Sequence, residues 1–449
     1  MTADHNAEQR NQSMFQRFIH SEVLGSVLLL ACAVAALVWA NSPWGDSYQH
    51  LLHTKIGVTW GKAAFQLSLH HWINDGLMAI FFFVVGLEIK REVVVGELAS
   101  FKKAVLPFSA ALGGMIAPAV LYSIMNFHGP GAKGWGIPMS TDIAFAIGVL
   151  SLFGSRVPIS LKVFLTALAI VDDLGAVVVI ALFYTEKIAF SGLIVAVILM
   201  VAIVVAGRMG VRRTSIYLLL CIGVWAAVFT SGIHTTVAGT LIAMLVPVRA
   251  TIEPRTFLTR CRQRLDQLQT TTLTQQSMIH DHAQLEALGD IYMAAEDMTP
   301  AGIGLEHHLH PVTSFLILPL FALFNAGVLV SIESLQAGPF SVGLGVVAGL
   351  VLGKQIGVLG ASWLAIRSGR AELPTGVCWI QLWGASCLAG VGFTMSLFIS
   401  SLAFRDPALD SQAKLGVLTA SLLAGIFGFI VLQRVLPRDK DKQESAGPT

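Results

Sequence analysis

The sequence predicts an all-α integral membrane protein with about twelve transmembrane helices. Of its 449 residues, 55% are hydrophobic and 12% are charged, and the mean hydropathy is +0.71. An average soluble domain carries roughly 25% charged residues. Apolar stretches of about 20 residues, which are long enough to cross a bilayer as helices, recur along almost the whole chain. These observations exclude an ordinary soluble domain.

Twelve spans can be placed by apolar length. The first follows Arg10 and Arg17, as the apolar region of a signal peptide would, but it is too long for one and ends without a good cleavage site, so we keep it as a span. In chain order, the predicted spans are Glu22–Ala40, His70–Ile89, Ala104–Phe127, Trp135–Phe153, Ser160–Thr185, Ala189–Ala206, Ser215–Thr230, Ile233–Val248, Pro311–Val330, Phe340–Ile366, Val377–Leu402 and Leu415–Val435.

The distribution of basic residues predicts the orientation. With the N-terminus in the cytoplasm, 22 Lys and Arg residues fall on cytoplasmic segments, 6 on outer loops, and one, Lys354, inside a span. Cytoplasmic loops carry the excess of Lys and Arg in membrane proteins, so we expect both termini to be cytoplasmic. The net charge of +2 is explained by this orientation and indicates no nucleic-acid partner.

The chain divides into a transmembrane domain (residues 1–435) that contains a polar cytoplasmic insert (249–309), followed by a tail (436–449) that we expect to be disordered. Within the insert, "RCRQRLDQLQ" and "HAQLEALGDIYMAAEDM" have the 3.6-residue periodicity of amphipathic helices and predict a helical hairpin. The five cysteines show no metal-site spacing, and no nucleotide-binding motif is present, so we expect no cofactor.

Two predicted spans carry helix breakers at mid-depth. The fourth has Gly136 and Pro138 in "GWGIPMSTDIAFAIG", and the eleventh has Gly390 and Gly392 in "ASCLAGVGFTMSLF". Unwound backbone at this depth is tolerated only where protein or a water-lined cavity satisfies it. We expect two discontinuous helices. The alternative is close helix packing at glycine and a simple kink at proline.

Ionisable residues within spans indicate a functional site, because they are expensive to bury in a membrane. The set comprises Asp75, Asp142, Asp172, Asp173 and Lys354, with Glu88 nearer a boundary and His234 at the start of a span. At 1.5 Å per residue, three of these spans place Asp142, Asp172 and Lys354 at a similar depth, near the bilayer centre. Their lengths therefore allow one common site.

Asp172 and Asp173 are neighbours on one predicted helix. Adjacent helical residues are about 100° apart, so one carboxylate should face a cavity and the other a neighbouring helix. Lys354 is the natural counter-ion for one of them. The alternative, in which Lys354 snorkels to an interface, is disfavoured by its distance from both ends of its span.

A buried carboxylate can exchange a proton for a cation. Burial favours its protonated form, and a hard cation such as Na⁺, which prefers oxygen ligands, can use it only after the proton leaves. If the site opens to one side of the membrane at a time, this competition couples the two flows without ATP.

Five motifs in order resemble the NhaA-type sodium/proton antiporter family: "STDIAFAIGVL", "ALAIVDDLGAVVVIALFYT", "LPLFALFNAGV", "GLVLGKQIG" and "GVGFTMSLFISSLAF". The resemblance covers nearly all of residues 22–435. This family is itself a type example of inverted-repeat transporters, so it implies inverted-topology repeats and two broken helices that cross, spans four and eleven. The segment 249–304 is much longer than the corresponding link in the best-known family pattern, and it directly precedes the predicted pH-sensing residue Glu306.

The resemblance also implies the transport chemistry. Asp173 is expected to be the principal sodium ligand and Asp172 its companion, paired with Lys354, while Thr141 and Asp142 lie at the break of the fourth span. The family exports Na⁺ or Li⁺ and imports a larger number of H⁺, so transport is electrogenic and serves sodium and pH homeostasis. We expect a bacterial inner-membrane protein that functions as a homodimer in the lipid bilayer and is not an enzyme.

Family pH regulation maps onto six residues of the cytoplasmic mouth: Glu88, Lys90, Arg91, Glu306, His307 and His310. Histidine titrates near neutrality, but an ordinary charged loop face explains these residues equally well. His234 is interpreted as a packing histidine, and Asp75 as a residue of the outer funnel or a helix cap.

Two other classes of protein remain to be weighed. An intramembrane aspartyl protease needs two carboxylates that converge from separate helices to share a proton. Asp172 and Asp173 lie side by side and cannot converge in this way, whereas Asp142 with Asp173 could. A cation channel would place rings of carbonyls or charges around an axis, whereas these charges are few and asymmetrically distributed.

Overall fold

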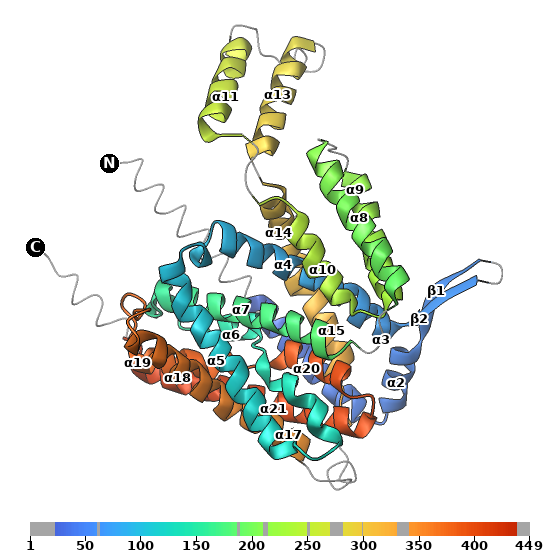
Figure 1. Cartoon of the computed structure of the whole chain (residues 1–449), viewed down its shortest axis with the longest axis vertical. Helices are drawn as coiled ribbons and strands as arrows, with labels where there is room; N and C mark the ends of the chain where they lie inside the picture. The colour runs from blue at the N-terminus through green and yellow to red at the C-terminus, as the bar shows by residue number, and fades with distance from the viewer. Residues whose placement is uncertain are drawn as a thin grey trace, which may run out of the picture.

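The computed structural model describes residues 23–60, 63–185, 189–209, 214–248, 252–269, 282–298, 300–329 and 341–437. Within these ranges the chain folds into a packed body of helices with two projections (Figure 1). One projection is a helical hairpin and the other is a two-stranded β-hairpin. The predicted disordered tail lies almost wholly outside the described residues.

The first half of the described chain starts with the helix Val23–Ala40. It continues with α2 Gly45–His53, β1 Lys55–Trp60, β2 Ala63–Ser68, α3 Leu69–His71, the π-helix η1 Trp72–Leu77, α4 Met78–Val94, the 3₁₀ turn η2 Glu97–Ala99, α5 Phe101–Asn126, the 3₁₀ segment η3 Pro130–Met139, α6 Ile143–Ser151, the 3₁₀ turn η4 Gly154–Arg156, α7 Ile159–Phe183, α8 Phe190–Arg208, α9 Thr214–Ser231 and α10 Thr235–Leu245.

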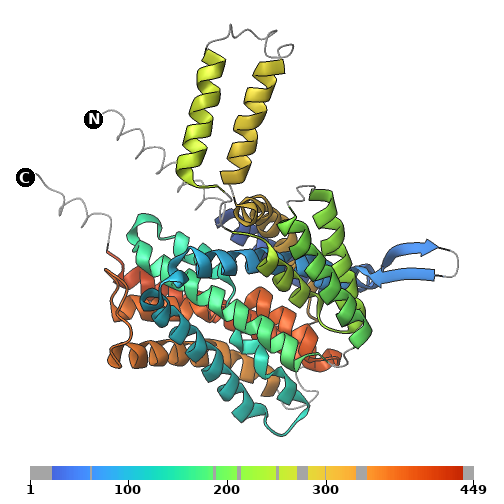
Figure 2. The same cartoon turned by 45° about the horizontal axis from the view of Figure 1, so that its top comes forward.

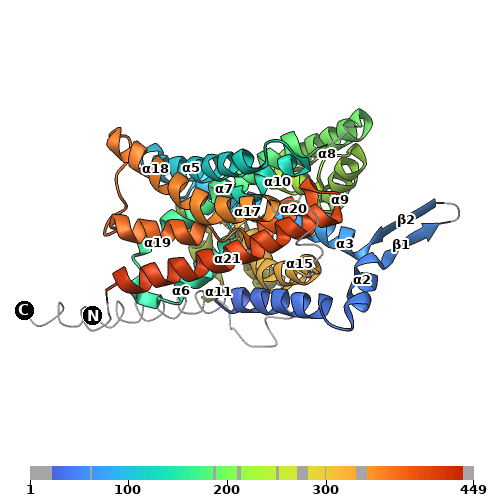
Figure 3. The same cartoon turned by 90° about the horizontal axis from the view of Figure 1, so that it is seen from below.

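The second half starts with the projecting helical hairpin. Its elements are α11 Pro254–Gln269, α13 His282–Met298, α14 Ala301–Val312, the π-helix η5 Thr313–Ile317, α15 Leu318–Asn325, α17 Ser341–Ala348, the π-helix η6 Gly349–Gly353, α18 Lys354–Arg367, α19 Trp379–Ala389, α20 Phe393–Ala403 and α21 Pro407–Val435. Figure 3 shows the long helix α21 running along α19 and α17 on one side of the body.

The helices identify a multi-pass membrane protein. Among the described residues, seven helices are long and apolar enough to cross a membrane, and an eighth span is formed by the bent pair α19 and α20. Helix α8 shows why no soluble fold accommodates them, because large apolar side chains such as Ile194 and Ile198 are each 60% exposed. Exposed apolar area of this extent requires lipid or another apolar partner.

Two helices begin more than two turns before their predicted start. The helix predicted to begin at Pro311 begins at Ala301, and Pro311 lies inside it, directly before the widened π turn η5. The last helix begins at Pro407 rather than Leu415, because the Asp406 side chain caps it and its polar first turns are paired internally. Polar residues made both helices appear shorter in the sequence than they are.

The β-hairpin was not predicted. Strands β1 and β2 pair antiparallel from Lys55 with Ser68 to Trp60 with Ala63. An all-α description is therefore correct for the membrane body but omits this short projection, which is visible beside α2 in Figure 1. The segment consists of only two six-residue strands and lies between the first two predicted spans.

Close contact between α5 and α18 depends on glycine. A Cβ atom added to Gly113 would lie 2.2 Å from the carbonyl oxygen of Gly357, and one added to Gly357 would lie 2.1 Å from the oxygen of Gly113. Small residues let membrane helices approach backbone to backbone in this way. The contact holds α18, and with it Lys354 at its first position, against the bundle core.

Candidate ion-binding site

The fourth predicted span is discontinuous. The 3₁₀ segment η3 ends at Met139, residues 140–142 are extended, and α6 begins at Ile143. Asp142 is the N-cap of α6, where its Oδ1 accepts a 3.0 Å hydrogen bond from the backbone N–H of Phe145. Asp, Asn, Ser and Thr favour this position because they satisfy the free N–H groups of a first helical turn.

The eleventh predicted span is also discontinuous, with a bend of 42° between α19 and α20. Its break contacts the break of the fourth span directly. The N–H of Asp142 donates to the carbonyl of Val391 at 2.7 Å, and the Ser396 hydroxyl donates to the carbonyl of Ile137 at 2.7 Å. The two breaks therefore satisfy part of each other's free backbone, as unwound segments at membrane depth require.

Asp142 lies where the N-termini of α6 and α20 converge. Its Oδ2 accepts two hydrogen bonds from Thr394, one from the backbone N–H at 3.0 Å and one from the hydroxyl at 2.6 Å. The N-terminus of a helix carries a partial positive charge, so two such ends stabilise one carboxylate. Asp142 is only 2% exposed.

The aspartate pair lies near the middle of α7 and is fully enclosed. Asp172 is 0% exposed and Asp173 is 2% exposed. Oδ2 of Asp172 forms a buried ion pair with the Lys354 ammonium and also lies 2.7 Å from the Thr141 hydroxyl. That hydroxyl has a second acceptor, the carbonyl of Ala389 at 2.8 Å, so its single proton serves one of them at a time.

The pair leaves carboxylate oxygens without partners. Among the described residues, Oδ1 of Asp172 and Oδ1 of Asp173 are both buried with no hydrogen-bond donor. The charges of Asp172, Asp142 and Glu88, together with the opposite charge of Lys354, all act on Asp173. A buried ion without compensation is strongly disfavoured. This site therefore needs a cation or bound protons.

Lys354 is positioned by a widened helical turn. It follows the π-helix η6 directly and opens α18, with 0% of its side chain exposed. Single π turns occur frequently at functional sites because they redirect side chains. A Cβ atom at Gly114 of α5 would lie 2.9 Å from Cγ2 of Val358 on α18, so the glycine lets α5 pack closely against the helix that begins with Lys354.

The glycine and proline residues that predicted the breaks lie in the two discontinuous spans. Gly136 donates through its N–H to the Tyr184 hydroxyl at 3.3 Å, and Pro138 lies within η3. A Cβ atom at Gly390 would lie 2.4 Å from the carbonyl of Leu350, and one at Gly392 would lie 2.3 Å from the Ser396 hydroxyl. The second break therefore requires residues without side chains.

The structure places Asp75 and His234 outside this cluster. Asp75 lies in the π-helix η1, where Thr235 donates its hydroxyl to the backbone oxygen at 2.8 Å. His234 precedes α10, and its Nε2 lies 3.0 Å from the carbonyl of Tyr184. The contact of His234 is that of a packing residue between segments.

Part of the predicted pH-sensing set is brought together between α4 and α14. The Arg91 Nε donates to both oxygens of Glu306 at 3.0 and 3.1 Å, and Lys90 binds the carbonyls of Met244 and Val246 at the end of α10. His307 is exposed and His310 is half-buried on α14, and Glu88 lies on α4, two residues before Lys90.

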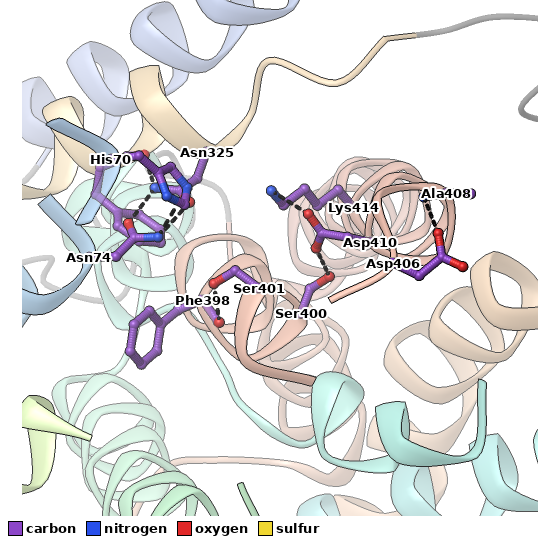
Figure 4. A network of polar contacts seen from close by, with 11 residues as sticks. His70, Asn74, Asn325, Phe398, Ser400, Ser401, Asp406, Ala408, Asp410 and Lys414 are labelled. Atoms are coloured by element: carbon purple, nitrogen blue, oxygen red, sulfur yellow. Dashed lines mark hydrogen bonds and ion pairs between the residues drawn. The ribbon is translucent and has the colours of Figure 1, made fainter. Parts of the chain in front are cut away.

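Two polar networks that the sequence patterns did not predict are shown in Figure 4. Asn74 and Asn325 exchange amide hydrogen bonds at 3.2 and 2.9 Å, and Asn74 also lies 3.2 Å from His70. Near the start of α21, Asp410 pairs with Lys414 at 2.8 Å and accepts from Ser400 at 2.7 Å. Asn325 lies within the apolar motif "LPLFALFNAGV". A polar residue in such a motif was the feature of the sequence that could have predicted this network.

Comparison with known proteins shows the family to which this chain belongs. A family model described as "Na+/H+ antiporter 1" matches residues 16–432. The chain belongs to the NhaA family of Na⁺/H⁺ antiporters. It is 47% identical over 421 residues to Na(+)/H(+) antiporter NhaA of Sulfurimonas denitrificans, which covers 93% of this chain and 95% of the relative.

Other NhaA relatives match over a similar length. The chain is 46% identical over 431 residues to the NhaA antiporter of Oleidesulfovibrio alaskensis, covering 96% of both chains. It is 43% identical over 434 residues to that of Wolinella succinogenes, covering 97% of this chain and 96% of the relative. Membership of the NhaA family makes the protein a membrane transporter that exchanges Na⁺ and H⁺, and not an enzyme.

Proposed function

We propose that this NhaA protein exports cytoplasmic Na⁺ or Li⁺ in exchange for external H⁺ at a single site formed by Asp172 and Asp173. The observation that carries the proposal is the pair of buried carboxylate oxygens, one on each aspartate, that have no donor. Oxygen ligands suit a hard alkali cation. Protons satisfy the same oxygens when the cation is absent.

Lys354 takes part in the exchange through its ion pair with Asp172. An arriving cation competes with the ammonium for the Asp172 carboxylate, and the freed ammonium, buried without a counter-ion, loses a proton more readily. The Thr141 hydroxyl can donate its hydrogen bond either to the Asp172 carboxylate or to the carbonyl of Ala389, so it can stabilise the carboxylate when Lys354 is displaced. The negative charge of Asp142 compensates the partial positive charges at the N-termini of α6 and α20, and it adds to the negative charge near the ion site.

The exchange is electrogenic in this proposal, because two buried carboxylates can release more than one proton for each monovalent cation. Alternating access follows from the twelve-span, inverted-repeat architecture, in which the crossed breaks of spans four and eleven form the moving centre. The protein resides in the bacterial inner membrane as a homodimer with both termini cytoplasmic. The proton gradient supplies the driving force, so no nucleotide or cofactor takes part.

We also propose that the cytoplasmic mouth regulates activity with pH. The ion pair of Arg91 and Glu306 joins α4 to α14, and His307 and His310 follow on α14. Helix α4 also carries Glu88, whose charge acts on Asp173. Protonation in this cluster would therefore weaken the ionic contact between α4 and α14. A shift of α4 would in turn change the position of the Glu88 charge relative to the ion site.

Fluorescence of a pH dye in proteoliposomes tests the proposed function. Pulses of Na⁺ or Li⁺ should move protons across the membrane, K⁺ should not, and an imposed membrane potential should change the rate. A response to K⁺ equal to that to Na⁺ would refute the selectivity, and a rate independent of potential would refute the electrogenic exchange. A Na⁺ current unaffected by clamping pH would indicate a channel instead.

A further inference from the structure

Gln355 is a polar residue on the lipid-facing side of the tenth predicted span. It directly follows Lys354 in "GLVLGKQIG", near the middle of that span, and it is half-buried. Its surroundings on the outer face of the helix are apolar, since Leu352 and Ile356 are 54% and 66% exposed. A polar side chain at this depth is costly unless a protein group satisfies it.

The group that satisfies Gln355 belongs to the neighbouring helix. Helices α18 and α19 lie side by side at one edge of the body (Figures 1 and 2). The indole N–H of Trp383 on α19 donates to Oε1 of Gln355 at 2.9 Å. Trp383 and the nearby Ile380 are 42% and 52% exposed, so this hydrogen bond lies on a face that meets lipid, where no water can replace it. Among the described residues, no other hydrogen bond joins α18 to α19.

The turn that carries Lys354 is held at both of its neighbours. On the preceding side, a Cβ atom added to Gly353 would lie 2.7 Å from Cα of Pro118, so α5 packs directly against the end of η6. On the following side, Gln355 is held by α19 through its hydrogen bond. The two contacts fix the backbone of Lys354 directly after a π turn, a kind of turn that redirects side chains.

Helix α19 also reaches the ion site at its other end. It ends at Ala389, whose carbonyl is the second acceptor of the Thr141 hydroxyl. Trp383 and Ala389 belong to the same short helix. The hydrogen bond between Trp383 and Gln355 therefore fixes the turn of Lys354 relative to the carbonyl that competes for Thr141.

These contacts form a closed ring that includes the Asp172 carboxylate. Lys354 pairs with Oδ2 of Asp172, and the Thr141 hydroxyl lies within hydrogen-bonding distance of the same oxygen. Thr141 also contacts α19 at Ala389, and α19 is joined to α18 by the indole of Trp383. A connected set of polar contacts makes each member more rigid than the same contacts made singly.

We propose that Gln355 is a positioning residue of the exchange site, which, through Trp383, holds Lys354 where its ammonium competes effectively with the cation for Asp172. This inference rests on the exchange proposed above, in which Na⁺ displaces Lys354. A well-placed ammonium raises the Na⁺ concentration needed to fill the site, and its return expels the bound Na⁺. Loss of the hydrogen bond should therefore lower both the apparent KM for Na⁺ and the maximal rate.

Two substitutions remove the hydrogen bond without adding charge. Gln355→Met removes the amide acceptor at similar length, and Trp383→Phe removes the indole donor but keeps an aromatic ring. Initial rates of Na⁺-driven proton movement by the full chain in proteoliposomes at alkaline pH give the KM and the maximal rate. We expect both quantities to fall several-fold in each variant, with no further fall in the double variant, because either change alone removes the bond. Additive effects in the double variant would overturn the proposal.

Trp363→Phe is the matched control. Trp363 is a 50% exposed residue of α18, and its ring contact with Arg367 can be made by phenylalanine as well. Its KM should equal that of the wild type, and a fall equal to that of Trp383→Phe would overturn the proposal. A lower maximal rate of Gln355→Met at constant KM would also overturn it, because a purely structural loss reduces the amount of active protein and not the KM.

The wild type in the same assay separates this inference from the proposed function. A wild-type KM for Na⁺ that does not change with pH would refute the shared site, and the role of Gln355 would fail with it. A wild-type KM that rises as the pH falls, together with an unchanged KM in Gln355→Met, would reject the positioning role alone.

Discussion

Thr394 donates two hydrogen bonds to Oδ2 of Asp142 and so joins the breaks of two helices that lie 252 positions apart in sequence. One donor is the backbone N–H at the start of α20, and the other is the side-chain hydroxyl. Because Asp142 also caps α6, a single carboxylate neutralises two helix ends. The contact between the two broken helices is thus stabilised by specific hydrogen bonds to Asp142.

Thr394→Val should destabilise the protein and reduce transport, whereas Thr394→Ser should retain both. Valine keeps the shape but removes the hydroxyl from a buried carboxylate, which costs about 1–3 kcal/mol. Thermal unfolding in detergent and the transport rate in proteoliposomes measure the two effects. Ser401→Ala is the control, because that hydroxyl donates only to the Phe398 carbonyl of its own helix. Equal stability of the Val and Ser variants would contradict the fastening role.

Asp172→Asn and Asp173→Asn should each abolish Na⁺-driven proton movement in protein that still folds, and Asp172→Asn should also lower the unfolding temperature, because it leaves Lys354 without its counter-ion. An amide cannot release a proton and binds Na⁺ through one neutral oxygen. The pH-dye signal measures activity, and gel filtration with thermal unfolding measures folding. Asp406→Asn is the matched control, since asparagine can still cap α21 at this exposed position. Retained exchange in either site variant would exclude that carboxylate from the exchange.

Lys354→Met should destabilise the protein strongly, and a second change, Asp172→Asn, should restore much of the loss. Removing one member of a buried ion pair leaves an uncompensated charge and costs about 3–5 kcal/mol. The double variant removes both members of the pair, so neither Lys354 nor Asp172 is left as an uncompensated charge, and it should unfold near the wild-type temperature yet remain inactive. Thermal unfolding of the four proteins in this cycle gives the coupling free energy. Additive effects would mean that the ion pair does not couple the two residues.

The positions of the intramembrane charges were predictable from the sequence, and their contacts were not. Asp142, Asp172, Asp173 and Lys354 are conspicuous because apolar spans rarely contain ionisable residues. Span lengths alone placed three of them at one depth. The partners of Asp142, however, are the N-termini of α6 and α20, and no local pattern in the sequence shows which distant helix end will face a given carboxylate.

The features that the sequence did not predict share a physical reason. They lie in short or polar segments, which lack the long apolar stretches by which membrane helices are recognised. The reciprocal Asn74–Asn325 hydrogen bonds join uncharged residues of two apolar segments, so neither residue is prominent by charge. The start of α21 was hidden because Asp410 and Lys414 interrupt its apolar character, although their ion pair satisfies both. The periodicity of the insert, by contrast, predicted α13 to the residue, because 3.6-residue spacing is a local property.

The apparent KM for Na⁺ should rise as the pH falls, while the maximal rate at saturating Na⁺ changes less. A proton that must leave before Na⁺ binds raises the apparent KM by the factor 1 + [H⁺]/Ka, where Ka is the dissociation constant of that proton, and this factor approaches about tenfold per pH unit below its pKa for one competing proton. Initial rates over a range of Na⁺ concentrations at several pH values measure this. A constant KM from alkaline to acid pH would mean that the two ions occupy separate sites.

Glu306→Gln should shift the pH at which transport turns on without changing the affinity for Na⁺ at the optimum. The variant removes the negative charge that Arg91 holds through two hydrogen bonds, so α14 loses its ionic contact with α4. The residues that bind the ion in our proposal are untouched, which is why the KM should be preserved. The pH profile of the dye signal at saturating Na⁺ measures the shift.

Glu97→Gln is the matched control, since Glu97 pairs with Lys103 at a surface where both side chains are exposed. The loss of this pair should leave the pH profile unchanged. Identical profiles for the wild type and Glu306→Gln would remove this ion pair from the regulatory mechanism, whereas a raised KM at every pH would instead place Glu306 on the path of the ion.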